Sequence, residues 1–251
     1  MSARQFENFV EVVRRLRKEC PWDREQTHES IRYGLIEEAY EVVEAIDGNN
    51  LEELKKELGD LLLHVVFHSS IAEEKGEFTL QAVIEDITEK LIRRHPHVFG
   101  DVQVSGPQEV KQNWEKIKLA EGRHSVVDGV PRELPALLRA LRVQDKASKV
   151  GFDWEKKEDV WEKVKEELEE LQHEAAAGNH ERIEEEFGDL LFAIVNYARF
   201  LHTTPEYALR RTVDKFIERF QYIEAKLKEQ GKDITKTSLA EMDKLWEEAK
   251  G

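Results

Sequence analysis

The chain has 251 residues, of which 36% are charged and 40% hydrophobic, and its 53 acidic side chains outnumber 38 basic ones to give a net charge of -15. This composition is typical of a folded protein, and the acidity disfavours a nucleic-acid partner, whose phosphates need clustered basic residues. The single cysteine, Cys20, excludes a disulfide framework. The first twenty residues hold no apolar run long enough for a signal peptide or a membrane span. We therefore expect a cytoplasmic protein without a membrane partner.

Apolar residues recur at spacings of three and four along nearly every long segment, which is the pattern of amphipathic helices. Gly48 and Gly76 each follow such a segment, where glycine commonly ends a helix. Thr79 is placed to cap the start of the next segment. No segment shows strand-like alternation between turn signals, so we predict an all-α fold. In the first part of the chain, the expected helices cover residues 6–18, 30–46, 51–75 and 80–95.

The helical pattern is interrupted between residues 119 and 135, where two glycines and two prolines gather. These residue types commonly mark a linker, and the helical pattern begins again after them. We therefore expect an N-terminal helical domain over residues 1–120, a linker over 121–130 and a C-terminal helical domain over 131–251.

The second domain repeats the acidic pattern of the first. Asp23 and Asp153 are separated by nearly the same number of residues as the other repeated acids. We expect each of these two aspartates to cap a helix. Small changes in offset are what loop insertions would produce, so we interpret the chain as two copies of one helical unit. A single constant shift along the chain carries Glu37 to Glu166, Glu38 to Glu167, Glu41 to Glu170, Glu57 to Glu186 and Asp60 to Asp189.

The repeated acids are spaced to meet across two neighbouring helices. Glu38 and Glu41 lie three residues apart, as do Glu57 and Asp60, so each pair shares one helix face. The turn at residues 48–50 would make the two helices antiparallel neighbours. Four converging carboxylates need a countercharge, and oxygen ligands suit Mg²⁺, or alternatively Mn²⁺. The same prediction holds for the second copy, with Glu167, Glu170, Glu186 and Asp189.

Two alternatives compete with a metal site. In an acidic chain, acids at helical spacing are often a solvated helix face, and the protein would then be a non-catalytic helical scaffold or interaction protein. A di-iron carboxylate site is the other, but neither half has a Glu-x-x-His motif. We interpret His64 and His68 as core-facing or hydrogen-bonded residues. The unchanged spacing of five acids in both halves favours the metal site over a solvated face.

Several basic and aromatic residues are candidates for contacts to an anionic substrate. Each has a plainer alternative, a surface salt bridge for the cations and an anchor to the core for the tryptophans. Trp114 and Trp246 are each followed four residues later by a lysine and could stack on a base. The substrate-binding candidates are Lys90, Arg93, Arg94, Trp114, Lys118, Lys163, Arg182, Lys215, Arg219, Trp246 and Lys250.

The combined pattern, E-E-x-x-E followed after fifteen residues by E-x-x-D, resembles the all-α nucleotide pyrophosphohydrolases, and its tandem arrangement resembles the MazG family. The stretches "CPWDREQT" at Cys20, "RRHPHVFGD" at Arg93 and "VGFDW" at Val150 are similar to MazG as well. The resemblance covers nearly the whole chain. It implies Mg²⁺-dependent hydrolysis of NTPs or dNTPs between the α and β phosphorus atoms, giving a nucleoside monophosphate and pyrophosphate.

The resemblance also implies the eight metal ligands named above and a homodimer in which each protomer supplies half of a helical bundle. Glu37 and Glu166 stand just outside the ligand sets, and we expect them to orient or deprotonate the attacking water. We expect broad base specificity, because apolar pockets discriminate weakly between similar bases. House-cleaning of the nucleotide pool would suit such an enzyme, and a partner from a toxin–antitoxin or stress-response system is left open.

Overall fold

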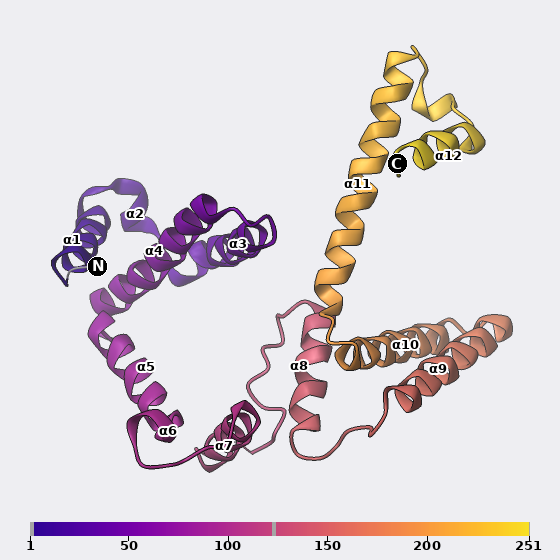
Figure 1. Cartoon of the computed structure of the whole chain (residues 1–251). Helices are drawn as coiled ribbons and strands as arrows, with labels where there is room; N and C mark the ends of the chain where they lie inside the picture. Colours follow the sequence, from indigo (N-terminus) through magenta and orange to yellow (C-terminus); the bar gives the residue numbers. More distant parts are fainter. Residues whose placement is uncertain (1–2, 122–123, 251) are drawn as a thin grey trace. The chain divides into compact units, whose positions relative to one another are not determined.

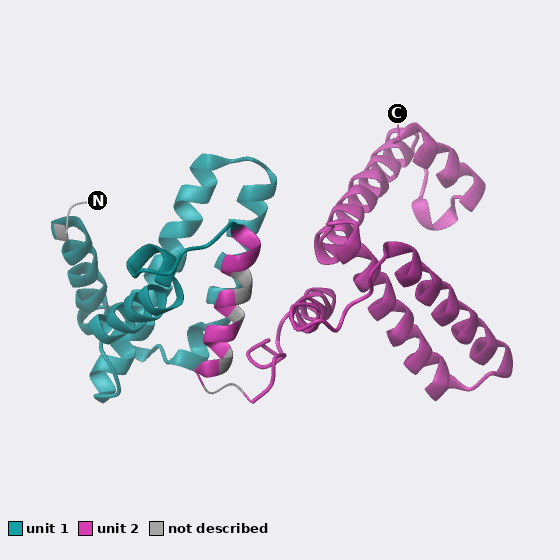
Figure 2. Ribbon diagram, turned by 60° about the horizontal axis from the view of Figure 1, so that its bottom comes forward, with its two compact units in different colours: residues 1–106 teal, residues 107–251 magenta. Residues whose placement is uncertain are grey.

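The computed structural model describes residues 3–121 and 124–250, which form two compact units, residues 1–106 and 107–251 (Figure 2). Within the described ranges every regular element is a helix, so the all-α prediction is confirmed (Figure 1). None of these helices has the length and apolar character needed to cross a membrane. The first unit contains α1 (Ala3–Glu19), α2 (Pro21–Glu25), α3 (His28–Asp47), α4 (Leu51–Lys75), α5 (Leu80–Arg94) and α6 (Pro96–Phe99).

The second unit repeats the arrangement of the first, which confirms the prediction of tandem helical repeats. In each unit two long helices, α3 with α4 and α9 with α10, form a closely packed hairpin. A shorter helix, α1 or α8, packs against the second helix of its hairpin. The second unit contains α7 (Pro107–Ala120), α8 (Ala136–Ser148), α9 (Lys157–Ala177), α10 (His180–Phe200), α11 (Pro205–Glu229), the 3₁₀ helix η1 (Ile234–Lys236) and α12 (Leu239–Glu248).

Equivalent asparagines start the second helix of each hairpin. The Asn50 side chain accepts a hydrogen bond from the Glu53 amide at 3.1 Å, and Asn179 caps α10 in the same way through the Arg182 amide. Thr79 caps α5 as predicted. The preceding helices end differently, because Gly178 takes a left-handed conformation with φ of 73° whereas in the first unit Asn49 does so with φ of 50°.

The prediction that Asp23 and Asp153 cap helices is wrong. Asp23 lies inside α2, whose N-cap is Cys20. Asp153 precedes α9 by several residues and forms an ion pair with Arg199 of α10. Asp153 therefore ties the segment before α9 to α10.

The first unit has a core in which α1, α4 and α5 meet. Val13, Val66 and Ile71 are its most deeply buried members, and Phe67 is 6% exposed. In the second unit, α12 folds back on α11 through Ile223, Leu227 and Leu245. Large apolar side chains nevertheless remain exposed on the hairpins of both units, including Leu58 and Leu62 on α4 and Phe187 and Leu191 on α10.

Candidate functional site

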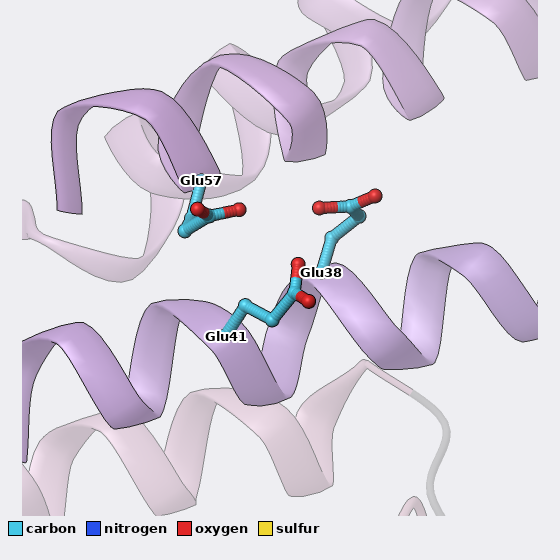
Figure 3. Close-up of side chains that lie close together, drawn as sticks. All are labelled: Glu38, Glu41 and Glu57. Carbon is cyan, nitrogen blue, oxygen red and sulfur yellow. The ribbon is translucent and has the colours of Figure 1, made fainter. Parts of the chain in front are cut away.

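The hairpin of the first unit brings three of the four predicted acids together. Glu38 and Glu41 project from α3 toward Glu57 on α4, in the space between the two helices (Figure 3). One carboxylate oxygen from each lies within 4.8 Å of the others. Asp60, one turn further along α4, is exposed and stands outside this set, but its charge acts on Glu38. We call Glu38, Glu41 and Glu57 the first cluster.

The second unit brings together a different three of its four acids. Glu167 on α9 and Glu186 and Asp189 on α10 each offer an oxygen within 4.8 Å of the others. Glu170 stands outside this set, although its charge acts on Glu186. We call Glu167, Glu186 and Asp189 the second cluster.

Acids of both clusters hold their protons more tightly than isolated carboxyl groups do. Burial, followed by a hydrogen bond with Glu53 and the charge of Glu41, raises the pKa of Glu57 from 4.5 to about 7. Burial and then the charge of Asp60 raise the pKa of Glu38, and burial and then the charge of Glu170 raise that of Glu186. Burial is the largest cause of each shift and the charges of neighbouring acids add to it, and a bound cation would favour the ionised form of all three acids.

Both clusters fit a hard divalent cation. Every donor in them is a carboxylate oxygen, which is the ligand type that Mg²⁺ and Mn²⁺ prefer. Oxygens bound to one Mg²⁺ ion lie at most about 4.2 Å apart, twice the usual bond length. The observed limit of 4.8 Å therefore requires only small rotations of the side chains to close around an ion.

Lys163 supplies a positive charge at the second cluster. Its Nζ lies 2.8 Å from Glu166 Oε1 and 2.7 Å from Glu167 Oε1. Hydrogen bonds to Glu166 and then Glu167 raise the pKa of the lysine. The corresponding position of the first unit, under the shift that relates the acids, is occupied by Gly34. Lys163 is thus a substrate-binding candidate that the structure places directly beside the acids.

The two acids predicted to act on water lie next to the clusters and are exposed. Glu37 immediately precedes Glu38 on α3, and Glu166 precedes Glu167 on α9. Glu166 is held by its ion pair with Lys163. The carboxylates of Glu37 and Glu166 are therefore open to solvent. The role of these two acids in activating water stays a prediction.

Most of the other predicted cations lie on α5, α10 and α11. Arg182 lies at the start of α10, 3.4 Å from Glu185. The α5 candidates are Lys90, Arg93 and Arg94, and those of α11 are Lys215 and Arg219. Helix α5 packs against α4 and α6, and α11 packs against α8 and α12. Their contacts with a substrate stay predictions.

The two tryptophans differ in their surroundings. The Nζ of Lys118 lies 4.2 Å from the centroid of the Trp114 ring. Trp246 packs against Phe216, with ring centroids 5.2 Å apart, and lies beneath Arg219. Trp246 therefore packs against the core formed by α11 and α12, and its stacking on a base stays a prediction. Lys250, the remaining candidate, pairs with Glu247 near the end of the chain.

His64 and His68 are core-facing, as one of our two interpretations has it, but one ring nitrogen of each has no hydrogen-bond partner. His64 Nδ1 and His68 Nε2 are buried without a hydrogen-bond partner. His68 Nδ1 lies 2.8 Å from His28 Nδ1, a contact that sequence reasoning missed because it joins α3 to α4 across 40 residues. Burial lowers the pKa of both His64 and His68, which favours neutral rings.

A cavity of about 600 Å³ adjoins the second cluster, and nothing in our sequence analysis pointed to it. It is lined by residues of α8, α9, α10 and the segment between α8 and α9, including Lys163, Glu167 and Asp189. Most other lining residues are apolar or uncharged, so no charge motif marks them in the sequence. The available signal was a comparison of side-chain sizes between the two repeats.

Comparison with known proteins identifies the family. The model of the MazG nucleotide pyrophosphohydrolase domain matches twice, at residues 26–99 and 155–223. The chain is 48% identical to the nucleoside triphosphate pyrophosphohydrolase/pyrophosphatase MazG of Thermotoga maritima, over 98% of this chain and 96% of that protein. It is 42% identical to the nucleoside triphosphate pyrophosphohydrolase of Escherichia coli K12, over 98% and 97% respectively.

A third relative is the uncharacterized protein YabN of Bacillus subtilis, which is 50% identical over 98% of this chain and 52% of its own length. The two domain matches contain all eight predicted metal ligands, four in each. With two domain matches and relatives of nearly equal length, the chain belongs to the MazG nucleotide pyrophosphohydrolase family and is an enzyme rather than a scaffold.

Proposed function

We propose that the protein hydrolyses ribo- and deoxyribonucleoside triphosphates in the presence of Mg²⁺, cleaving between the α and β phosphorus atoms. The products are a nucleoside monophosphate and pyrophosphate. The observation that carries this proposal is the pair of all-carboxylate clusters, which occupy equivalent helices of both units. The names of the Thermotoga maritima and Escherichia coli relatives agree with the reaction.

The chain's own residues divide the work as follows. The three acids of each cluster hold the cation, and we expect Asp60 in the first unit and Glu170 in the second to complete the ligand set. Bound Mg²⁺ neutralises phosphate charge and lowers the pKa of a water molecule. We expect Glu37 and Glu166 to orient that water and to accept its proton. Lys163 can exchange its contact with Glu167 for one with a phosphate oxygen once a cation neutralises the acids.

We propose that the working form is a homodimer. Leu58 and Leu62 are exposed on the acid-bearing helix of the first unit, as are Phe187 and Leu191 on that of the second. Exposed apolar side chains repeated in this way are typical of a surface covered by another chain. Light scattering combined with size-exclusion chromatography tests this proposal, and a monomer at micromolar concentration would contradict it.

Broad base specificity and a house-cleaning role in the cytoplasm complete the proposal. The acidic net charge supports a free nucleotide as substrate over a nucleic acid. Any metal-bound nucleotide brings its own cations, which offsets the repulsion between an acidic protein and an anionic substrate.

The decisive experiment follows pyrophosphate release from all eight common nucleotides with Mg²⁺ present and inorganic pyrophosphatase absent. Pyrophosphate is expected as the first product, and orthophosphate alone would overturn the reaction. A double variant, Glu57→Gln with Glu186→Gln, should lose the activity. The matched control is Glu44→Gln with Glu169→Gln, which changes exposed acids on α3 and α9 and should behave as the parent does.

A further inference from the structure

The cavity beside the second cluster combines a mostly apolar wall with charged residues on the side of the acids. Lys163, Glu167 and Asp189 line it on the side of the acids, and Val143, Ala147 and Phe152 contribute apolar wall. Its volume of about 600 Å³ is within the range of small-molecule sites. A nucleotide whose phosphates lie at the second cluster would therefore find room for its base in the cavity.

Gln144 places an unsatisfied hydrogen-bond acceptor in the wall of this cavity. The residue is 8% exposed, and its Nε2 donates to the carbonyl oxygen of Phe192 at 2.8 Å. A carbonyl can only accept, so this contact fixes which end of the amide is nitrogen. The other end, Oε1, is buried without a hydrogen-bond partner. An unpaired buried acceptor is costly, and a ligand that donates a hydrogen bond to it would remove this cost.

Asn196, which also lines the cavity, is oriented in the opposite sense. Its Oδ1 accepts from Arg199 Nε at 3.2 Å and from Nη2 of the same guanidinium at 3.0 Å. Arg199 is itself held by Asp153, the residue that ties the segment before α9 to α10. Because its oxygen is occupied, Asn196 offers its amide nitrogen as a donor. The wall thus carries one acceptor and one donor, each fixed by the protein.

Equivalent positions of the first unit hold larger side chains. Under essentially the same shift that relates the acids, Arg17 corresponds to Ala147, His64 to Ala193 and Phe67 to Asn196. Arg17 is 5% exposed, its guanidinium lies 5.3 Å from the Phe67 ring centroid, and it donates to the carbonyl oxygens of Asp23 and Gln26. The smaller side chains at these positions in the second unit leave room for the cavity that lies beside its acids.

We propose that this cavity holds the nucleobase of the substrate and that Gln144 Oε1 accepts a hydrogen bond from a base N–H, while Asn196 donates to a base acceptor. The proposal rests on the proposed function and specifies the substrate contact. Every common base carries an N–H beside an acceptor on its Watson–Crick edge. One acceptor and one donor therefore suit all of them, in keeping with broad specificity, and reject analogues that lack the N–H.

The test compares UTP with N3-methyl-UTP, and ATP with purine riboside triphosphate, using the full chain and Mg²⁺. Sites built to hydrogen-bond a substrate group reject analogues without it, so we expect kcat/KM to fall by about tenfold or more for each analogue. Gln144→Met keeps the length of the side chain but removes the acceptor. In this variant the ratio of kcat/KM for the nucleotide to kcat/KM for its analogue should be about threefold or less. Arg14→Met changes the corresponding position of the first unit and should leave the ratio as in the parent.

The base pocket and the hydrolysis reaction can fail independently in these experiments. Equal kcat/KM for each nucleotide and its analogue, or an equal effect of Arg14→Met, would overturn the base pocket while leaving pyrophosphate release intact. Absence of pyrophosphate from every common nucleotide would overturn the proposed function. If Gln144→Met fails to fold, the ratio of kcat/KM for each nucleotide to that for its analogue, measured in the parent protein, still decides. Calorimetric binding of UMP and N3-methyl-UMP without metal gives a second measurement, in which we expect UMP to bind more tightly.

Discussion

The first and second units place equivalent acids on equivalent helices, yet they differ in what lies behind those acids. In the first unit, Arg17 of α1 packs on Phe67 of α4, and the ring of His64 lies against Gly34 of α3. In the second, Ala147, Ala193 and Asn196 leave a cavity that reaches the acids. Selection on the metal ligands alone would preserve the acids in both units and leave the neighbouring side chains free to diverge.

The countercharge differs as well. Lys163 pairs with two acids of the second unit, whereas Gly34 stands at that position in the first. In the first cluster, Glu57 has a pKa raised to about 7, chiefly by burial, so it keeps its proton to a higher pH than an isolated glutamate does. We therefore propose that both units bind metal and that the second unit also recognises the base.

The largest expected effect concerns the packing of the first unit. Phe67→Ala should lower the free energy of unfolding by about 3–5 kcal/mol, because it leaves a void in a closed core. Urea unfolding followed by tryptophan fluorescence measures this change. Asn196→Ala, the matched variant, removes only a partner of Arg199 at an open cavity and should cost about 1 kcal/mol. Equal losses from the two variants would contradict the contrast between a filled and an open space.

The helices and the pairing of acids could be predicted from the sequence because they depend on local periodicity. Gly76 ends α4 and Thr79 starts α5 where local signals placed them. The cavity could not be predicted, because it depends on three small side chains from two helices whose packing the periodicity does not specify. The orientation of Gln144 likewise depends on a carbonyl 48 residues away.

Substituting one acid in each cluster sharpens the comparison next. Glu186→Gln should reduce kcat/KM for nucleotide hydrolysis by about a hundredfold, because a bound cation loses a charged ligand beside the base pocket. Glu57→Gln should reduce it by about tenfold or less. Steady-state pyrophosphate release from UTP measures both, and Glu169→Gln serves as the control. A greater loss from Glu57→Gln would reverse the assignment of the two units.

Filling the cavity with the residue that the first unit carries is the next test. Asn196→Phe copies Phe67 and should raise KM for every common nucleotide by about tenfold, since the base loses its space and a donor. The acids are untouched, so calorimetric Mg²⁺ binding without nucleotide should remain as in the parent. Unchanged KM values in a folded variant would show that the base lies elsewhere.

The smallest expected effect is the pH dependence of metal binding at the first cluster. The pKa of Glu57 is raised from 4.5 to about 7, so the folded state retains a proton that the unfolded chain releases. Without metal, this group therefore contributes stability at low pH that is lost as the pH rises between these two values. A cation must displace the proton, so Mg²⁺ should bind more tightly as the pH rises through 7. Between pH 6.5 and 7.5 the affinity should increase about threefold, and binding should release part of one proton.

Calorimetry of the Glu186→Gln variant in buffers of different ionisation enthalpy isolates this behaviour, because its second cluster is disabled. Adding Glu57→Gln removes the titrating carboxyl group and should make the remaining Mg²⁺ affinity nearly independent of pH in this range. The second cluster differs because Lys163 offsets part of its negative charge. An affinity that falls as the pH rises would have the wrong sign for displacement of a carboxyl proton and would exclude Glu57 as the group that the metal deprotonates.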